Sequence, residues 1–198
     1  MSTEMVIFKQ EGTAEAYCEI QNSWRGAMAI WMFLEKKYLP PFRPSYVPES
    51  IPDDDVVSYL GYEPTRAAPL LNQEEHLKNM QEVWDLFNHQ EVSRAEKIVL
   101  GTTFDYTLVR REDLPEVIEA FLAFEGVTSL PEQAKAMEPL INNESVLAVG
   151  WSQNSITENQ WTQFNYIEEN EEYEPYNLQV EAHFWVLDEI DKQLEKNE

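Results

Sequence analysis

Residues 14–39 constrain the fold of this chain more than any other stretch. Apolar and aromatic residues recur there at alternating steps of three and four, the spacing that aligns side chains along one side of a helix. They are Tyr17, Ile20, Trp24, Ala27, Trp31, Leu34 and Tyr38. The nine residues 26–34 carry no charge, and a helix that is apolar on most sides is buried on most sides. Because a membrane span needs ~20 apolar residues, the pattern predicts a buried central helix in a soluble core.

A proline-rich segment follows this predicted helix, which cannot continue through Pro40 and Pro41. Seven of the eleven prolines lie between residues 40 and 69. We predict one short helix over 53–60, with aspartates in its first turn and Gly61 at its end. Several apolar side chains predict that residues 40–70 form an ordered excursion that packs over the central helix. They are Tyr46, Val47, Val56, Tyr59, Tyr62 and Leu70.

The rest of the chain alternates short strands with amphipathic helices. Strands are predicted at 5–8, 106–109 and 146–151, with 161–167 as the antiparallel partner of the last. Helices are predicted at 72–88, 93–100, 112–124, 129–141 and from 177 onward. This mixture indicates an α+β fold in one domain over 1–198. We expect a small, mainly antiparallel sheet of about three to four strands, packed with about five to seven helices around the central helix.

The net charge restricts the partners of the protein. The chain has 37 acidic and 14 basic residues, which gives a formal charge of −23. A field of this sign repels nucleic acids and anionic membranes, so neither is expected as a direct partner. Two interpretations of the charge stay open. It keeps the protein in solution, or it forms a surface that docks on a basic partner, including a protein that normally holds nucleic acid.

The acidic residues are densest near the C-terminal end of the chain. Five glutamates occur within seven residues, and they are Glu168, Glu169, Glu171, Glu172 and Glu174. Residues 165–198 contain eleven acids and two bases, a net charge of −9. Because this excess is not balanced by nearby bases, the run predicts the surface that faces a basic protein partner.

The sequence lacks the motifs of the common enzyme and cofactor classes. Its six glycines are too far apart for a phosphate-binding loop, and its three histidines and single cysteine have no zinc-site spacing. Cys18 has no neighbouring histidine to activate it as a nucleophile. His183 is either a general base or an ordinary histidine at the edge of the core. We therefore expect no cofactor and no metal, and the balance favours a protein that is not an enzyme.

One charged residue lies in an unusual place. Arg25 stands at the entrance to the uncharged part of the predicted central helix, and a guanidinium so near a core needs a carboxylate or carbonyl partner. It forms either a structural salt bridge or the floor of a pocket for an anion or a partner. In the second case, Asn22, Trp24 and Arg25 line a pocket that residues 40–70 cover.

Two functions fit these patterns. The first is a non-enzymatic interaction module, such as an inhibitor, an immunity-type protein, or a phage or mobile-element accessory protein that imitates nucleic acid and docks on a basic partner. The alternative is a small-molecule-binding or anion-binding protein, or a small enzyme, that uses the Arg25 pocket. Residues 1–4 contain neither the basic nor the apolar region of a secretion signal, so we expect a cytoplasmic protein.

Overall fold

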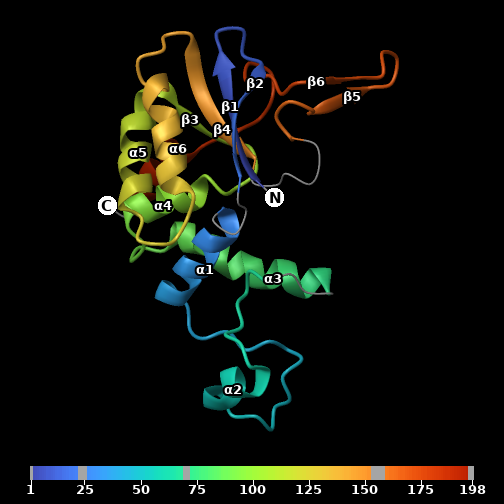
Figure 1. Cartoon of the computed structure of the whole chain (residues 1–198), viewed down its shortest axis with the longest axis vertical. Helices are drawn as coiled ribbons and strands as arrows, with labels where there is room; N and C mark the ends of the chain where they lie inside the picture. The colour runs from blue at the N-terminus through green and yellow to red at the C-terminus, as the bar shows by residue number, and fades with distance from the viewer. Residues whose placement is uncertain (1, 22–25, 69–71, 153–158, 196–198) are drawn as a thin grey trace.

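A five-stranded sheet forms the centre of the computed structural model, which describes residues 2–21, 26–68, 72–152 and 159–195 (Figure 1). Its strands lie in the order β2-β1-β4-β3-β7. All neighbours are antiparallel except β3 and β7, which are parallel. A separate hairpin pairs β5 with β6. The strands are β1 Ser2–Lys9, β2 Ala14–Gln21, β3 Thr107–Arg110, β4 Val146–Ser152, β5 Asn165–Ile167, β6 Glu172–Glu174 and β7 Phe184–Trp185.

Seven α-helices accompany the sheet in the described residues, so the predicted α+β fold in one domain is confirmed. The sheet has five strands, not the predicted three to four, and one of its pairs is parallel. The helices are α1 Ala27–Tyr38, α2 Val56–Leu60, α3 Gln73–Trp84, α4 Arg94–Gly101, α5 Leu114–Ala123, α6 Leu130–Met137 and α7 Val186–Glu195. Short 3-10 turns extend several of them, namely η2 Asp53–Asp55, η3 Asp85–Asn88, η4 Arg111–Asp113 and η5 Glu138–Leu140. Among the described residues, no helix combines the length and the apolar character that crossing a membrane requires.

The prediction of one helix over 14–39 is wrong in its first half, where the chain forms strand β2. The pairing of β2 with β1 shifts by one residue, so that Met5 faces Cys18 while Val6 faces Ala16. Tyr17 is the extra residue, and its hydroxyl donates a hydrogen bond to the Ala136 carbonyl at 2.9 Å. Such a bulge reverses which side chains face the core. The bulge therefore breaks the alternation of apolar and polar residues that marks a strand. As a result, the apolar residues recur at the spacing typical of a helix.

Helix α1 is also not the buried centre of the molecule. It buries one stripe, in which Ile30 and Leu34 are at most 1% exposed, while Met32 on another side is 40% exposed. Figure 1 shows α1 and α3 beyond one end of the sheet, whereas α4, α5 and α6 cover one of its faces. The core therefore lies between the sheet and these helices, and α1 closes its end.

The two faces of the sheet are covered differently. Along β1, Met5 and Ile7 belong to the helix-covered core, whereas Val6 and Phe8 belong to a second, largely aromatic cluster. That cluster is covered by the segment around Trp161 and Tyr176. The alternation follows from the period of two along a strand. Both faces of the sheet are therefore buried.

Two further predictions near the C-terminal end need correction. Residues 161–167 do not pair with β4, which lies between β1 and β3 instead. Trp161 packs beneath β4, and its indole Nε1 donates to the Trp151 carbonyl at 2.7 Å. The last helix begins at Val186, not near 177, because Phe184 and the next residue join the sheet beside β3.

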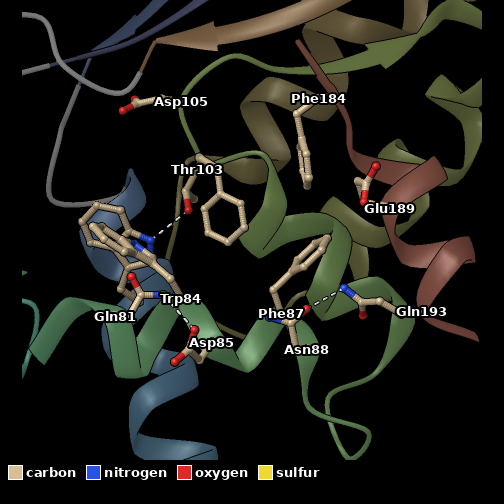
Figure 2. A pocket seen from close by; sticks show the side chains of 12 residues that line it. Gln81, Trp84, Asp85, Phe87, Asn88, Thr103, Asp105, Phe184, Glu189 and Gln193 are labelled. Carbon is tan, nitrogen blue, oxygen red and sulfur yellow. Dashed lines mark hydrogen bonds between the residues drawn. The ribbon is translucent and has the colours of Figure 1, made fainter. Parts of the chain in front are cut away.

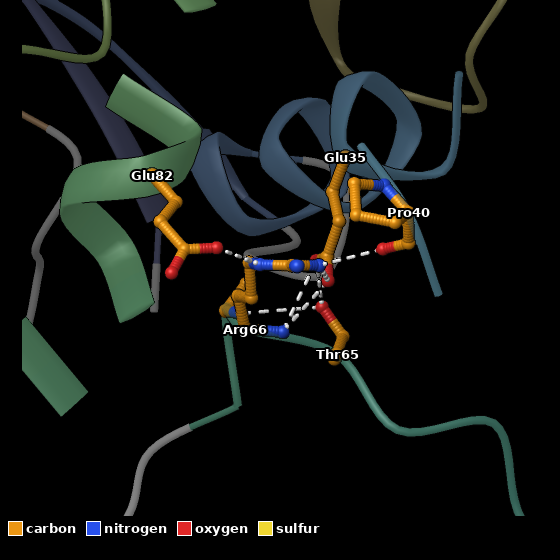
Figure 3. Close-up of polar contacts among 6 residues, drawn as sticks. Glu35, Pro40, Thr65, Arg66 and Glu82 are labelled. Atoms are coloured by element: carbon orange, nitrogen blue, oxygen red, sulfur yellow. Dashed lines mark hydrogen bonds and ion pairs between the residues drawn. The ribbon is translucent and has the colours of Figure 1, made fainter. Parts of the chain in front are cut away.

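The proline-rich excursion, which we call the arm (residues 40–68), is tied to α1 by a buried ion pair (Figure 3). The Arg66 guanidinium lies 3.0 Å from Glu35 of α1, and both side chains are less than a tenth exposed. The same guanidinium reaches Glu82 of α3 at 2.7 Å and the Pro40 carbonyl at 3.1 Å. The arm is therefore anchored to two helices by one charged residue.

The apolar residues of the arm contribute less to this anchoring than predicted. Val47 and Val56 are each only 4% exposed. The three tyrosines expected as anchors, Tyr46, Tyr59 and Tyr62, are each more than half exposed. Tyr59 lies on α2 and Tyr62 follows that helix, in the part of the arm that extends away from the sheet (Figure 1). The Tyr46 hydroxyl lies 2.5 Å from that of Tyr62. Leu70, also expected as an anchor, lies outside the described residues.

Candidate functional site

The predicted pocket formed by Asn22, Trp24 and Arg25 lies outside the described residues, so it stays a prediction. A cavity of about 370 Å³ does lie between the arm and the C-terminal half of α1. Its charged lining includes the acids Glu35 and Glu63 and the base Lys36. Lys36 pairs with Glu63 at 3.0 Å. The cavity beneath the arm therefore offers no favourable charge to an anion.

The acidic run forms the end of the β5–β6 hairpin, which projects from the body of the molecule (Figure 1). Tyr166 and Tyr173 face each other across the two strands, with ring centroids 4.9 Å apart. All five glutamates of the run are exposed. None of them forms an ion pair with any residue that the structure describes. The predicted partner surface is thus a projecting hairpin that carries five unneutralised charges, and we call it the acidic hairpin (residues 165–174).

The basic residues of the described chain are largely occupied elsewhere. Ion pairs engage Lys9, Lys36, Lys37, Arg43, Arg66, Arg94, Arg110 and Lys192. Most of these ion pairs join elements of the body or the arm. For example, Arg110 on β3 donates two hydrogen bonds, of 2.6 and 2.7 Å, to the Asp188 carboxylate on α7. The bases therefore balance acids of the body and the arm, and the acidic hairpin keeps its charge excess.

The turn of the acidic hairpin holds a glutamate in a backbone conformation that glutamate disfavours. Glu171 has a φ of 55°, in the left-handed region that costs a residue with a Cβ roughly 1–2 kcal/mol. Glycine or asparagine is the usual residue at such a position. The turn therefore has a charged glutamate at a position where the backbone conformation alone favours glycine or asparagine.

Replacing Glu171 with glycine is expected to stabilise the turn by about 1 kcal/mol, because glycine has no Cβ to clash in this region. The amide of Asn170, which donates to the Ile167 carbonyl at 3.2 Å, should then exchange its hydrogen about fivefold more slowly. Glu171→Gln is the control, since it removes the same charge and keeps the Cβ. Equal protection in both variants would mean that charge repulsion, not conformation, limits the turn.

A groove of about 560 Å³ is the second candidate site, and it was not predicted. It lies between α1, α3, η3, the residues that follow α4, β7 and α7 (Figure 2). Five aromatic side chains line it, and they are Trp31, Trp84, Phe87, Phe104 and Phe184. Its polar lining consists of Gln81, Asp85, Asn88, Thr103, Asp105, Glu189 and Gln193. We call it the aromatic groove; its size is typical of ligand sites.

Hydrogen bonds fix several walls of the aromatic groove. The Trp31 indole donates to the Thr103 hydroxyl at 2.8 Å, and that hydroxyl donates to the Leu100 carbonyl at 2.6 Å. The rings of Trp31 and Trp84 meet edge to face, 6.4 Å apart. Because these aromatics come from segments far apart in the chain, no local pattern could have indicated the groove.

The residues considered for catalysis lack suitable partners in the described part of the chain. The Cys18 thiol lies half-buried on β2, and burial raises its pKa, so little of it is the reactive thiolate at neutral pH. The His183 imidazole lies 5.0 Å from the Trp185 ring and contacts the Glu181 carbonyl through Nδ1 at 3.0 Å. No group of three or more possible metal ligands gathers among the described residues.

Glu96 is the centre of a polar cluster between α1 and α4. Its carboxylate accepts from the Lys37 amine and the Tyr38 hydroxyl, each at 2.7 Å, and from the Ser93 hydroxyl at 2.6 Å. Burial acts to raise the pKa of Glu96, but these hydrogen bonds outweigh it and hold the pKa below its usual range. Ser93 and Glu96 also form the capping box of α4. The cluster therefore joins two helices and leaves no free group for chemistry.

Comparisons with known proteins found no matching family model, no matching curated protein and no matching solved structure.

Proposed function

We propose that this protein is a non-enzymatic interaction module that docks on a basic protein partner through its acidic hairpin. The single observation that carries the proposal is that the five exposed glutamates have no ion-pair partner in the described structure, while most bases are engaged in the body and the arm. Like charges held close together repel one another, and a partner with lysine or arginine opposite them relieves that repulsion.

The conformation of the hairpin supports the same function. Tyr166 and Tyr173 are 49% and 39% exposed, so the hairpin presents aromatic surface together with charge. Tyrosine is enriched in protein interfaces because it offers a large, rigid contact area with a polar end. Glu171 keeps its charge despite an unfavourable φ of 55°. These features fit a surface selected for contact with another molecule.

The partner class that fits best is a protein that normally holds nucleic acid. Such a protein presents clustered lysine and arginine that neutralise phosphates, and a projecting row of carboxylates can occupy the same surface. An inhibitor, an immunity-type protein, or a phage or mobile-element protein that imitates nucleic acid would fit this role. On this proposal, duplex DNA or RNA competes with this protein for the partner.

Replacing Glu168, Glu169, Glu171 and Glu172 with glutamine is expected to slow association with the basic partner at least tenfold at low salt. The reason is that electrostatic steering raises association rates by about 10- to 1000-fold, and it fades as salt shortens the range of the field to about 10 Å at 0.1 M. The partner is first captured from the source cell and identified by mass spectrometry. Association rates are then measured across a series of salt concentrations.

A matched variant separates the effect of the hairpin charges on association from the effect of the protein's net charge. Glu119, Glu125, Glu138 and Glu144 are exposed residues on α5 or between α5 and β4, and their replacement with glutamine changes the net charge by the same amount. This control should keep most of the association rate and the salt dependence. Equal slowing in the two variants would show that only the overall charge matters, and an unchanged rate in the hairpin variant would refute the proposed interface.

A further inference from the structure

We propose that the aromatic groove receives the side chain of an arginine from the basic partner. The inference rests on the proposed function, and it names the chemistry by which that partner is recognised. Its first support is the lining, in which aromatic rings lie beside the acids Asp85, Asp105 and Glu189, and in which none of the described residues is basic. Aromatic faces and carboxylates both attract a cation, and the aromatic walls also shelter the aliphatic part of its side chain.

Two of these carboxylates are available to a ligand. Asp85 accepts a hydrogen bond from the Gln81 amide at 2.8 Å, and neither Asp85 nor Asp105 forms an ion pair in the described structure. Glu189, in contrast, is paired with Lys192. Figure 2 shows Asp85 and Asp105 on the side of the groove where Trp84 lies, with Glu189 on the other side. A cation beside Trp84 is therefore attracted by two uncompensated charges.

Arginine fits this lining better than lysine does. Its planar guanidinium stacks on aromatic rings, binds carboxylates through paired donors and is more weakly hydrated than an ammonium group. The protein itself contains an example of this arrangement. The Arg110 guanidinium lies 4.2 Å from the centre of the Trp185 ring and donates two hydrogen bonds to the Asp188 carboxylate. The aromatic groove offers the same combination of indole and carboxylate to a guanidinium from outside.

The experiment uses the full chain and three small probes: N-acetyl-arginine amide, N-acetyl-lysine amide and N-acetyl-citrulline amide. Citrulline has nearly the shape of arginine and no charge. Binding is followed by NMR through the indole N–H signals of Trp31 and Trp84, assigned with single Trp→Phe variants. We expect saturable shifts with the arginine probe at about millimolar concentration. The lysine probe should bind at least threefold more weakly, and the citrulline probe at least tenfold more weakly.

Variants locate the binding in the groove. Trp84→Leu and the double variant Asp85→Asn/Asp105→Asn should each weaken the arginine probe at least threefold. The matched control is Glu119→Gln/Glu138→Gln, at two exposed residues of the body, which removes the same number of charges and should leave binding unchanged. Thermal unfolding of each variant confirms that it is folded.

The outcomes distinguish this inference from the proposed function. Equal binding of citrulline, or binding that survives both groove variants, would overturn the arginine site. Equal binding of lysine would overturn the preference for guanidinium. A hairpin variant that leaves partner association unchanged would instead refute the docking surface, and the probe titration does not depend on that result.

Discussion

Replacing Arg66 with alanine is expected to destabilise the protein by about 3 kcal/mol, because it leaves the buried carboxylate of Glu35 without its cation. Removing one partner of a buried ion pair costs about 3–5 kcal/mol. The lower end applies here, since the Glu35 carboxylate keeps hydrogen bonds from the Thr65 hydroxyl at 2.5 Å and from the backbone amide of residue 66 at 2.9 Å. The free energy of unfolding is measured by urea denaturation.

Two further variants test whether the loss of stability comes from the buried ion pair. Arg43→Ala breaks another ion pair of the arm, with Asp53 at 2.7 Å, but the Asp53 side chain is 85% exposed. That change should cost less than about 1 kcal/mol. The double variant Glu35→Met/Arg66→Met removes both buried charges and should recover most of the lost stability. A cost below 1 kcal/mol for Arg66→Ala would mean that water reaches Glu35 and that the arm is not anchored by this pair.

The same contact shows why the anchoring of the arm could not be predicted from the sequence. Glu35 and Arg66 are 31 residues apart, and both resemble ordinary surface residues until the fold brings them together. The tyrosines of the arm were the visible apolar signal, and they lie mostly exposed. Burial is decided by tertiary contacts, so apolar composition alone could not separate Val47 and Val56 from their tyrosine neighbours.

Elements with a local signal were predicted well. The alternating or continuous apolar runs of β1, β3 and β4 and the helical period of α5 lie close to their observed positions. Strand β2 was missed because the bulge at Tyr17 broke its alternation. Residues 161–167 were misassigned because Trp161 enters the core while Tyr166 faces solvent, which leaves no clean apolar face.

The two candidate sites also differ in whether a local sequence signal reveals them. The acidic hairpin was visible in the sequence, since five glutamates within seven residues need no fold to be found. Strand β5 lies at the end of the strand predicted over 161–167, whereas β6 and the turn were not predicted. The aromatic groove was invisible, because Trp31, Trp84, Phe104 and Phe184 converge only in three dimensions. The Arg25 pocket stays a prediction, since its residues lie outside the described part of the chain.

Replacing Trp161 with alanine is expected to destabilise the protein by about 3–5 kcal/mol, the usual cost of removing a fully buried large aromatic side chain. The Trp161 side chain is 0% exposed and packs edge to face on Phe8 and on Tyr176, with ring centroids 5.5 and 4.9 Å away. The loss also leaves the Trp151 carbonyl without the indole hydrogen bond of 2.7 Å. Urea denaturation measures the loss, and Tyr166→Ala, at a side chain 49% exposed, should cost less than about 1 kcal/mol as the control.

This substitution also connects the core to the proposed interface. The Trp161 carbonyl accepts a hydrogen bond from the Tyr176 amide at 2.6 Å, at the base of the acidic hairpin. Removing the side chain should therefore loosen the base of the hairpin, so hydrogen exchange of the amides of β5 and β6 should rise together with the loss of global stability. If their protection stays unchanged while stability falls, the hairpin holds its shape independently of the aromatic cluster. In that case its turn and the Tyr166–Tyr173 contact alone present the glutamates to the partner.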